Sequence, residues 1–124
     1  MIDLAAAAVR KAREGAAAQD AFFAENAARI AACAVALARA FDAGARLFTV
    51  GNGGSSCDAA HAAVEFAHPV LEKRRAIPAM ALSSDAPLIT ALGNDQDFAV
   101  AFAHQVRLHA RSGDVVLGLS TSGK

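Results

Sequence analysis

The sequence contains no tryptophan and no tyrosine, and only two cysteines and three prolines in 124 residues. It therefore lacks the larger aromatic rings on which many proteins stack bases. Twelve basic residues are balanced by twelve acidic residues, so the formal net charge is zero. This balance argues against a nucleic-acid surface or a polybasic membrane patch. We expect neither nucleic acid nor a membrane among the partners.

Two cysteines are too few for a disulfide framework. Cys33 and Cys57 both fall in helical patterns, and we expect them to be buried thiols. The opening residues 1–4 include an acid and lack the basic start and unbroken apolar stretch of a secretory signal. No uncharged apolar run reaches the length of a membrane span. We therefore predict a cytoplasmic protein.

Apolar residues make up 55% of the sequence. Many of them are alanine, which favours tightly packed helices. The length suits one domain, residues 1–124. The apolar spacing predicts helices over 2–18, from Asp20 to about 41, and over about 56–67, 86–92 and 97–111, with strands at 46–50, 78–82 and 115–119. Helices that alternate with strands predict an α/β fold, a parallel sheet flanked by helices in three layers.

Local signals set these boundaries. Gly44 is expected to end the second helix, and Ser55 with Asp58 resembles a capping box at the start of the next one. The segment 93–95, Gly-Asn-Asp, is expected to interrupt the helical pattern. Residues 72–75 form a charged connection that we expect to be solvated.

A glycine-rich turn, residues 50–56 (Val-Gly-Asn-Gly-Gly-Ser-Ser), joins the first strand to a helix. Glycine lets the backbone approach a ligand closely, and a helix N-terminus attracts negative charge. Ligands of such sheets bind beyond the carboxyl ends of the strands. Segments 83–85 and 120–124 also follow strands and are rich in polar residues. The pattern predicts a site for a phosphorylated small molecule.

His61 and Glu65 follow the glycine turn and are spaced i, i+4, on one face of the expected helix. This pair could share a zinc ion. Alternatively, the carboxylate could act as a general base that the imidazole orients. An ordinary surface pair has the same spacing, but the adjacent glycine turn favours a functional role.

Ser120, Thr121 and Ser122 follow the last predicted strand and could bind a phosphate or cap a helix, or do both. Residues 118–124 also fit the spacing G-x-x-x-x-G-K of a nucleotide-binding loop, but without the Ser or Thr that must follow. The glycines at 51 and 53 lack the third glycine of a dinucleotide-binding turn, and Glu72 lies in a charged loop. We reject both nucleotide interpretations.

Residues 50–66, from the glycine turn through Glu65, resemble the glycine-loop helix of sedoheptulose 7-phosphate isomerases, also called phosphoheptose isomerases, within the SIS (sugar isomerase) fold. Residues 77–82, 92–95 and 113–123 are similar to the next blocks of that family, in the same order. The resemblance implies a flavodoxin-like or Rossmann-like sheet whose N-terminal helices pack in an oligomer.

The resemblance also implies a function. Sedoheptulose 7-phosphate would be converted to D-glycero-D-manno-heptose 7-phosphate, for surface polysaccharide synthesis, through an enediol with Glu65 as the base. Asn52, Gly53, Gly54, Ser55, Asn94 and Asp95 would contact the substrate, and Ser120, Thr121 and Ser122 would hold its phosphate. His61 and Glu65 would lie at a site for one Zn²⁺ per subunit. The family forms homotetramers whose active sites are shared between subunits.

Relatives of this kind continue beyond the block at 120–123 and add two strands and a C-terminal helix that carries a Gln and a His. We therefore expect a domain incomplete at its C-terminus, with little turnover from these residues alone. Pro69 stands where the family often has a basic residue. Two alternatives remain open: a non-catalytic SIS module that binds a partner, and a sugar-phosphate sensor. Non-catalytic relatives lack the acidic residue at the position of Glu65, so its presence favours the enzyme.

Overall fold

The computed structural model describes residues 3–70 and 74–123, so Glu72 and Lys73 of the charged connection lie outside the described residues, as does Lys124. The chain divides into two compact units, residues 1–36 and 37–124. Each unit is described by itself.

The first unit consists of most of one helix, α1 (Leu4–Asp42). The two helices predicted over 2–18 and from Asp20 onward are one continuous helix, so Asp20 caps nothing. Alanine is the best helix former, and the single Gly15 costs only about 1 kcal/mol, which an alanine-rich segment tolerates. None of residues 3–36 is buried within this unit. Its exposed apolar side chains include Phe22, Phe23 and Val35.

Among the described helices, only α1 is long and apolar enough to cross a membrane, judged by length and composition. None of its most apolar stretch is buried. One helix of this kind is weak evidence, because helices of soluble proteins and signal sequences meet the same criteria.

The second unit is built on three parallel strands, β1 (Leu47–Gly51), β2 (Ala79–Ala81) and β3 (Val115–Leu119). The strand order is β2-β1-β3, with β1 in the centre. Leu47 is aligned with Ala79 on one side and with Val115 on the other. The predicted parallel α/β sheet is therefore confirmed, and the three strands lie within one residue of their predicted positions.

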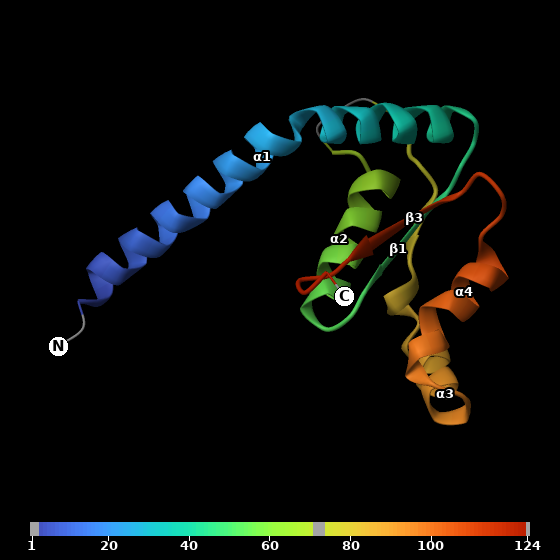
Figure 1. Cartoon of the computed structure of the whole chain (residues 1–124). Helices are drawn as coiled ribbons and strands as arrows, with labels where there is room; N and C mark the ends of the chain where they lie inside the picture. The colour runs from blue at the N-terminus through green and yellow to red at the C-terminus, as the bar shows by residue number, and fades with distance from the viewer. Residues whose placement is uncertain (1–2, 71–73, 124) are drawn as a thin grey trace. The chain divides into compact units, whose positions relative to one another are not determined.

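Helices cover the sheet. They are α2 (Gly54–Ala67), α3 (Ala86–Asp95) and α4 (Ala101–His109), with short 3₁₀ turns η1 (Leu82–Ser84) and η2 (Phe98–Val100). Figure 1 shows α2 and α4 on opposite sides of the strands. The core packs Phe41 and Ala45 against Leu47 and Ile77, with Phe66 of α2 beside them. Burial of this apolar surface is the main favourable term in folding.

Several predicted boundaries need correction. Helix α2 begins at Gly54 with Gly53 as its N-cap, and no side chain caps it, so the proposed capping box is absent. Gly53 has φ +54°, a left-handed conformation that glycine adopts at little cost. Helix α3 continues through the predicted break at 93–95, because one Gly inside a helix weakens it without ending it. Asp85 does cap α3, accepting a hydrogen bond from the Leu88 amide at 3.0 Å.

The two cysteines are free, as predicted, but both are exposed rather than buried. In α2 the buried positions are Ser55, Ala59 and Ala63, which follow a spacing of four residues. Cys57 is two residues from Ser55, which at about 100° per residue places it on the opposite face. Cys33 lies in the part of α1 that has no packing partner in its unit.

Candidate functional site

A hollow of about 640 Å³ lies at the carboxyl ends of β1 and β3, the two neighbouring strands whose ends carry the glycine turn and the serine-rich turn. Its walls come from three places in the sequence: the glycine turn, the end of β3 with the residues that follow it, and one side chain of α4. The lining residues are Val50, Gly51, Asn52, Ser55, Phe102 and residues 118–123.

The first wall depends on a very close approach of α2 to β1. A Cβ atom added to Gly51 would lie 2.3 Å from the Ser55 carbonyl oxygen and 2.6 Å from its carbon. Only glycine fits at this position, and the contact brings the start of α2 against the end of the strand. Thr49 fixes the next turn of α2 to β1, because its buried hydroxyl donates a 2.7 Å hydrogen bond to the Ala59 carbonyl.

The N-terminus of α2 offers backbone donors. The first N–H groups of a helix have no acceptor inside the helix. The Ser55 amide donates to the Asn52 carbonyl and the Ser56 amide to the Gly53 carbonyl, both at 3.0 Å. Among the backbone hydrogen bonds of the described residues that lie outside the helices and strands, none has the N–H of Gly53 or Gly54 as its donor. These two groups, with the helix dipole, suit an anion.

The second wall is the turn after β3. The Gly123 amide donates to Ser120 Oγ at 3.0 Å, and Ser120 Oγ lies 3.4 Å from Ser122 Oγ. Gly123 has φ +68°, which lets the chain fold back at this point. The Ser and Thr hydroxyls therefore gather at one exposed turn, and hydroxyl and amide groups can hydrogen-bond phosphate oxygens.

The structure brings together five of the predicted substrate-binding residues in the hollow: Asn52, Ser55, Ser120, Thr121 and Ser122. Gly53 and Gly54 follow Asn52 directly at the start of α2. Sequence reasoning missed Phe102, an apolar wall from α4, because a phenylalanine in a helical pattern carries no functional signal.

Asn94 and Asp95 are not among the residues that line the hollow. They lie at the end of α3, where the Asn94 side-chain amide donates to Asp95 Oδ1 at 2.7 Å. This contact satisfies polar groups of two exposed side chains within one turn. The structure therefore leaves their predicted contact with substrate as a prediction.

His61 and Glu65 do share one face of α2, with His61 Nε2 3.2 Å from Glu65 Oε1. Their side chains are 74% and 59% exposed, and neither lines the hollow of its own chain. Each follows a buried residue, Ala59 or Ala63, by two positions, so both project from the face opposite the sheet. In one chain the Glu65 carboxylate thus lies apart from the hollow, which we also call the cradle.

The described residues contain no cluster of three or more His, Cys, Asp or Glu that could hold a metal ion. A protein zinc site usually has at least three protein ligands. His61 and Glu65 supply two. The described part of this chain does not by itself make a complete zinc site.

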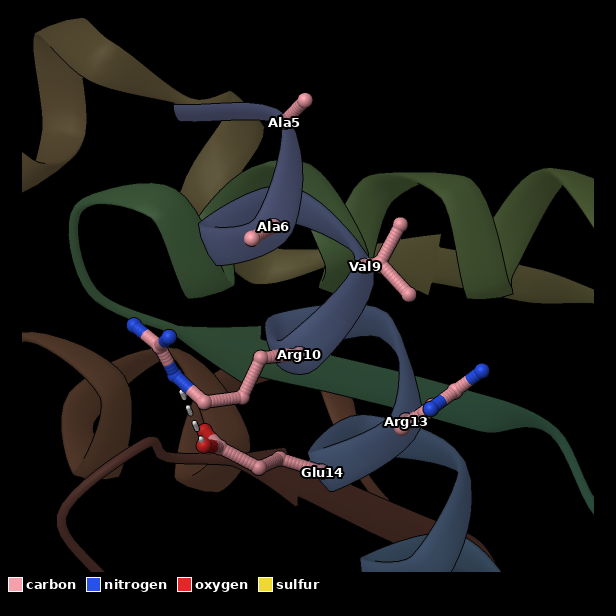
Figure 2. Close-up of a pocket in the computed structure, with 6 residues that line it drawn as sticks. All are labelled: Ala5, Ala6, Val9, Arg10, Arg13 and Glu14. Carbon is pink, nitrogen blue, oxygen red and sulfur yellow. Dashed lines mark ion pairs between the residues drawn. The ribbon is translucent and has the colours of Figure 1, made fainter. Parts of the chain in front are cut away.

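A second hollow lies entirely on the first turns of α1, where Figure 2 shows Arg10 beside Glu14. The Arg10 Nε to Glu14 Oε1 distance is 3.7 Å, and both side chains are more than half exposed. The remaining lining side chains are Ala5, Ala6, Val9 and Arg13. Exposed ion pairs of this kind contribute little, and no polar groups converge here. We assign this hollow no ligand.

The fold and the hollow define a parallel α/β domain that gathers polar groups at the carboxyl ends of β1 and β3. The SIS domain family profile matches residues 12–124, and the chain belongs to this family. It is 43% identical over 112 residues to a phosphoheptose isomerase of Desulfovibrio desulfuricans, covering 90% of this chain and 53% of that protein. It is 50% identical over 90 residues to one of Pelobacter propionicus, covering 73% and 48%.

Solved structures give the same picture. The phosphoheptose isomerase GmhA of Neisseria gonorrhoeae superposes with a TM-score of 0.79 at 29% identity, covering 96% of this chain and 60% of that one. A phosphoheptose isomerase of Francisella tularensis gives a TM-score of 0.79 at 28% identity, covering 98% and 63%. The chain spans about half the length of the curated relatives it matches.

Proposed function

We propose that the protein carrying this chain is a sugar-phosphate isomerase that interconverts sedoheptulose 7-phosphate and D-glycero-D-manno-heptose 7-phosphate. The observation that carries the proposal is the hollow at the ends of β1 and β3, where helix-terminal amides and the hydroxyls of Ser120, Thr121 and Ser122 converge. Relatives that are 40–50% identical to this chain over the matched residues bear the name phosphoheptose isomerase, which supports the choice of substrate.

The phosphate would be bound between the two turns that form the walls of the hollow. Amides at the start of α2 would meet one side of it, and the hydroxyls of residues 120–122 the other. Asn52 and Ser55 stand beside this position and would contact the sugar. Binding remote from the reacting carbons fixes the substrate so that proton transfer becomes effectively intramolecular.

The isomerisation itself moves protons. A base removes a proton from C1 of the ketose while the C2 oxygen gains one, which gives an enediol. The O1 proton then leaves and C2 is protonated, which gives the aldose. We assign the base to Glu65, with His61, 3.2 Å away, orienting its carboxylate.

We further propose that Glu65 serves the phosphate cradle of a neighbouring subunit. Its side chain is 59% exposed and lies outside the hollow of its own chain. A base that must reach a substrate cannot act from that position within one chain. A site shared between subunits resolves the conflict and gives the exposed pair a function.

Mixing two inactive variants tests this assignment. Glu65→Gln removes the base and keeps the shape, whereas Ser120→Ala with Thr121→Val removes hydroxyls from the cradle. Each variant should isomerise sedoheptulose 7-phosphate at a small fraction of the normal rate. Mixed oligomers formed after joint refolding should regain activity, because one subunit supplies the base and the other the cradle.

The outcomes separate the hypotheses. If each variant is inactive and the mixture stays inactive although mixed oligomers form, the site lies within one chain. Full activity of Glu65→Gln would refute the assignment of the base to Glu65. Absence of isomerisation by the unchanged protein would instead favour the non-catalytic SIS module or sensor. Glu14→Gln, which changes an exposed acid on α1, is the matched control and should behave as the unchanged protein.

A homotetramer in the cytoplasm is part of the same proposal. Support for association comes from α1, which leaves Phe22 54% and Phe23 57% exposed. Exposed aromatic pairs on a long helix are typical of protein–protein contacts. The free thiols of Cys33 and Cys57 are compatible with a reducing compartment.

Zinc at His61 and Glu65 is a separate proposal, and it competes with the role of Glu65 as base, because a carboxylate that binds a metal ion is less basic than a free one. The pair supplies two donors, so a bound ion would need further donors from outside the described part of this chain. Metal analysis of purified oligomer should find about one zinc per subunit, and His61→Ala should lose it. An equal zinc content in both proteins would refute the assignment.

A further inference from the structure

One carboxylate joins three elements at the amino end of the sheet, opposite the hollow. Asp114 Oδ1 accepts a hydrogen bond from the Arg46 amide at 2.8 Å. Asp114 Oδ2 accepts from Arg46 Nη2 at 2.6 Å and from the Arg111 amide at 2.8 Å. Arg46 Nη2 also donates to the His109 carbonyl at 2.8 Å. The starts of β1 and β3 and the end of α4 are therefore tied at one point.

This tie is directional and partly shielded from water. The Asp114 side chain is only 7% exposed, and the Arg46 side chain is 32% exposed. The guanidinium lies 5.3 Å from the centre of the Phe48 ring, a cation–π contact that limits its movement. A planar guanidinium that forks onto a carboxylate fixes geometry as well as charge.

The tie bears on the register of β3, because Asp114 directly precedes β3 and Arg46 directly precedes β1. A slip by one residue would move the end of β3 by about 3.3 Å along β1. That distance exceeds the tolerance of a hydrogen bond to a phosphate oxygen.

We propose that Asp114 and Arg46 are positioning residues for the phosphate site, which fix the register of β3 against β1. The Val115 amide donates to the Arg46 carbonyl at 2.9 Å, immediately beside the tie. The paired register then runs from Leu47 and Val115 to Gly51 and Leu119. The turn at 120–122 thereby comes to stand opposite the glycine turn.

The inference names phosphate as the ligand and in that respect rests on the proposed function. Its first test is to titrate the protein that carries this chain with inorganic phosphate and to monitor binding by amide NMR shifts. Asp114→Ala removes both carboxylate acceptors of the tie, and phosphate affinity should fall by about tenfold as the two turns lose their alignment. Asp114→Asn keeps one acceptor oxygen and should give an intermediate loss.

The matched control is Ile77→Ala, which removes a buried side chain of the core and changes no group of the tie or of the hollow. It should lower stability and leave phosphate affinity within about twofold of the unchanged protein. An equal loss of affinity in Ile77→Ala would show that lower stability alone weakens phosphate binding, and this result would overturn the inference. Unchanged affinity in folded Asp114→Ala would also overturn it.

Kinetics give a second, independent measurement. Asp114→Ala should raise KM for the sugar phosphate by about tenfold and change kcat by less than about twofold, because phosphate contacts act in both ground and transition states. Arg46→Lys keeps the backbone donor and the charge, and should retain most of the affinity. If Asp114→Ala does not fold, Asp114→Asn carries the test, and normal affinity in Asp114→Asn refutes the inference.

Failure of the inference and failure of the proposed function are distinguishable. A protein that does not isomerise but loses phosphate affinity in Asp114→Ala supports the positioning role and rejects the enzyme. A protein that isomerises with unchanged KM in Asp114→Ala supports the enzyme and rejects the positioning role.

Discussion

Substitution of Gly51 by alanine tests the close contact on which the first wall of the hollow depends. The added Cβ would meet the Ser55 carbonyl oxygen at 2.3 Å. To regain an ordinary contact, the oxygen must retreat by about 1 Å, and because it belongs to the backbone, the first turn of α2 must move with it. Overpacking of this kind costs about 1–3 kcal/mol.

The neighbouring strand provides a matched control. Gly118 lies opposite Val50 in the paired register, and a Cβ added there would meet only the Val50 Cγ2 atom at 3.7 Å, an ordinary contact. Gly118→Ala should therefore be neutral, or stabilising by up to about 1 kcal/mol through the lower entropy of the unfolded chain. We expect the two variants to differ by about 1–4 kcal/mol in the free energy of unfolding.

Urea unfolding followed by circular dichroism measures this difference directly. Gly51→Ala should also bind inorganic phosphate more weakly, because the amides of Gly53 and Gly54 move with the displaced turn. If the free energies of unfolding of Gly51→Ala and Gly118→Ala differ by less than about 0.5 kcal/mol, the close contact does not affect stability and the argument for the first wall fails.

Three further predictions concern stability and assembly. Thr49→Val should lower the free energy of unfolding in urea by about 1 kcal/mol, because the buried hydrogen bond to the Ala59 carbonyl is lost; an unchanged midpoint would contradict this. The Arg46 guanidinium, with the backbone amides of residues 46 and 111, holds the pKa of Asp114 well below its ordinary value of about 4. The contribution of Asp114 to the free energy of unfolding is therefore present above that ordinary pKa and is lost as the pH falls below it. The stability of Asp114→Asn should consequently drop less steeply on acidification than that of the unchanged protein. Equal slopes in urea series at several pH values would refute that assignment. Joint replacement of Phe23 and Ile30 by serine should shift the protein to smaller species in sedimentation velocity, and an unchanged distribution would show that α1 does not mediate assembly.

The sequence predicted the fold well where local signals were strong. The apolar runs gave all three strands, and Gly44, with φ +91°, follows the end of the first long helix as expected. The errors lie where one residue was given too much weight. Asp20 suggested a helix start inside an alanine-rich segment, and the glycine at 93 suggested a break, but helical propensity in the surrounding residues prevailed in both cases.

The site was predictable in part for a physical reason. Residues at the carboxyl ends of parallel strands meet at one edge of a sheet, so the convergence of Asn52 and Ser120 followed from the topology. A side chain on a helix face is harder to place, because the same spacing serves several roles. The separation of Glu65 from the cradle, and the presence of Phe102 in its wall, depend on how whole helices pack.

The two sides of the ligand hollow are anchored differently, and this has a dynamic consequence. The side built on β1 is pressed to its helix through Gly51 and tied to it through Thr49, so it should stay rigid whether or not ligand is present. The side built on β3 is fastened at its distant end by Asp114, while the serine turn projects into water. Ligand binding should therefore slow amide hydrogen exchange mainly at residues 120–123, because this turn becomes ordered against the rigid glycine turn.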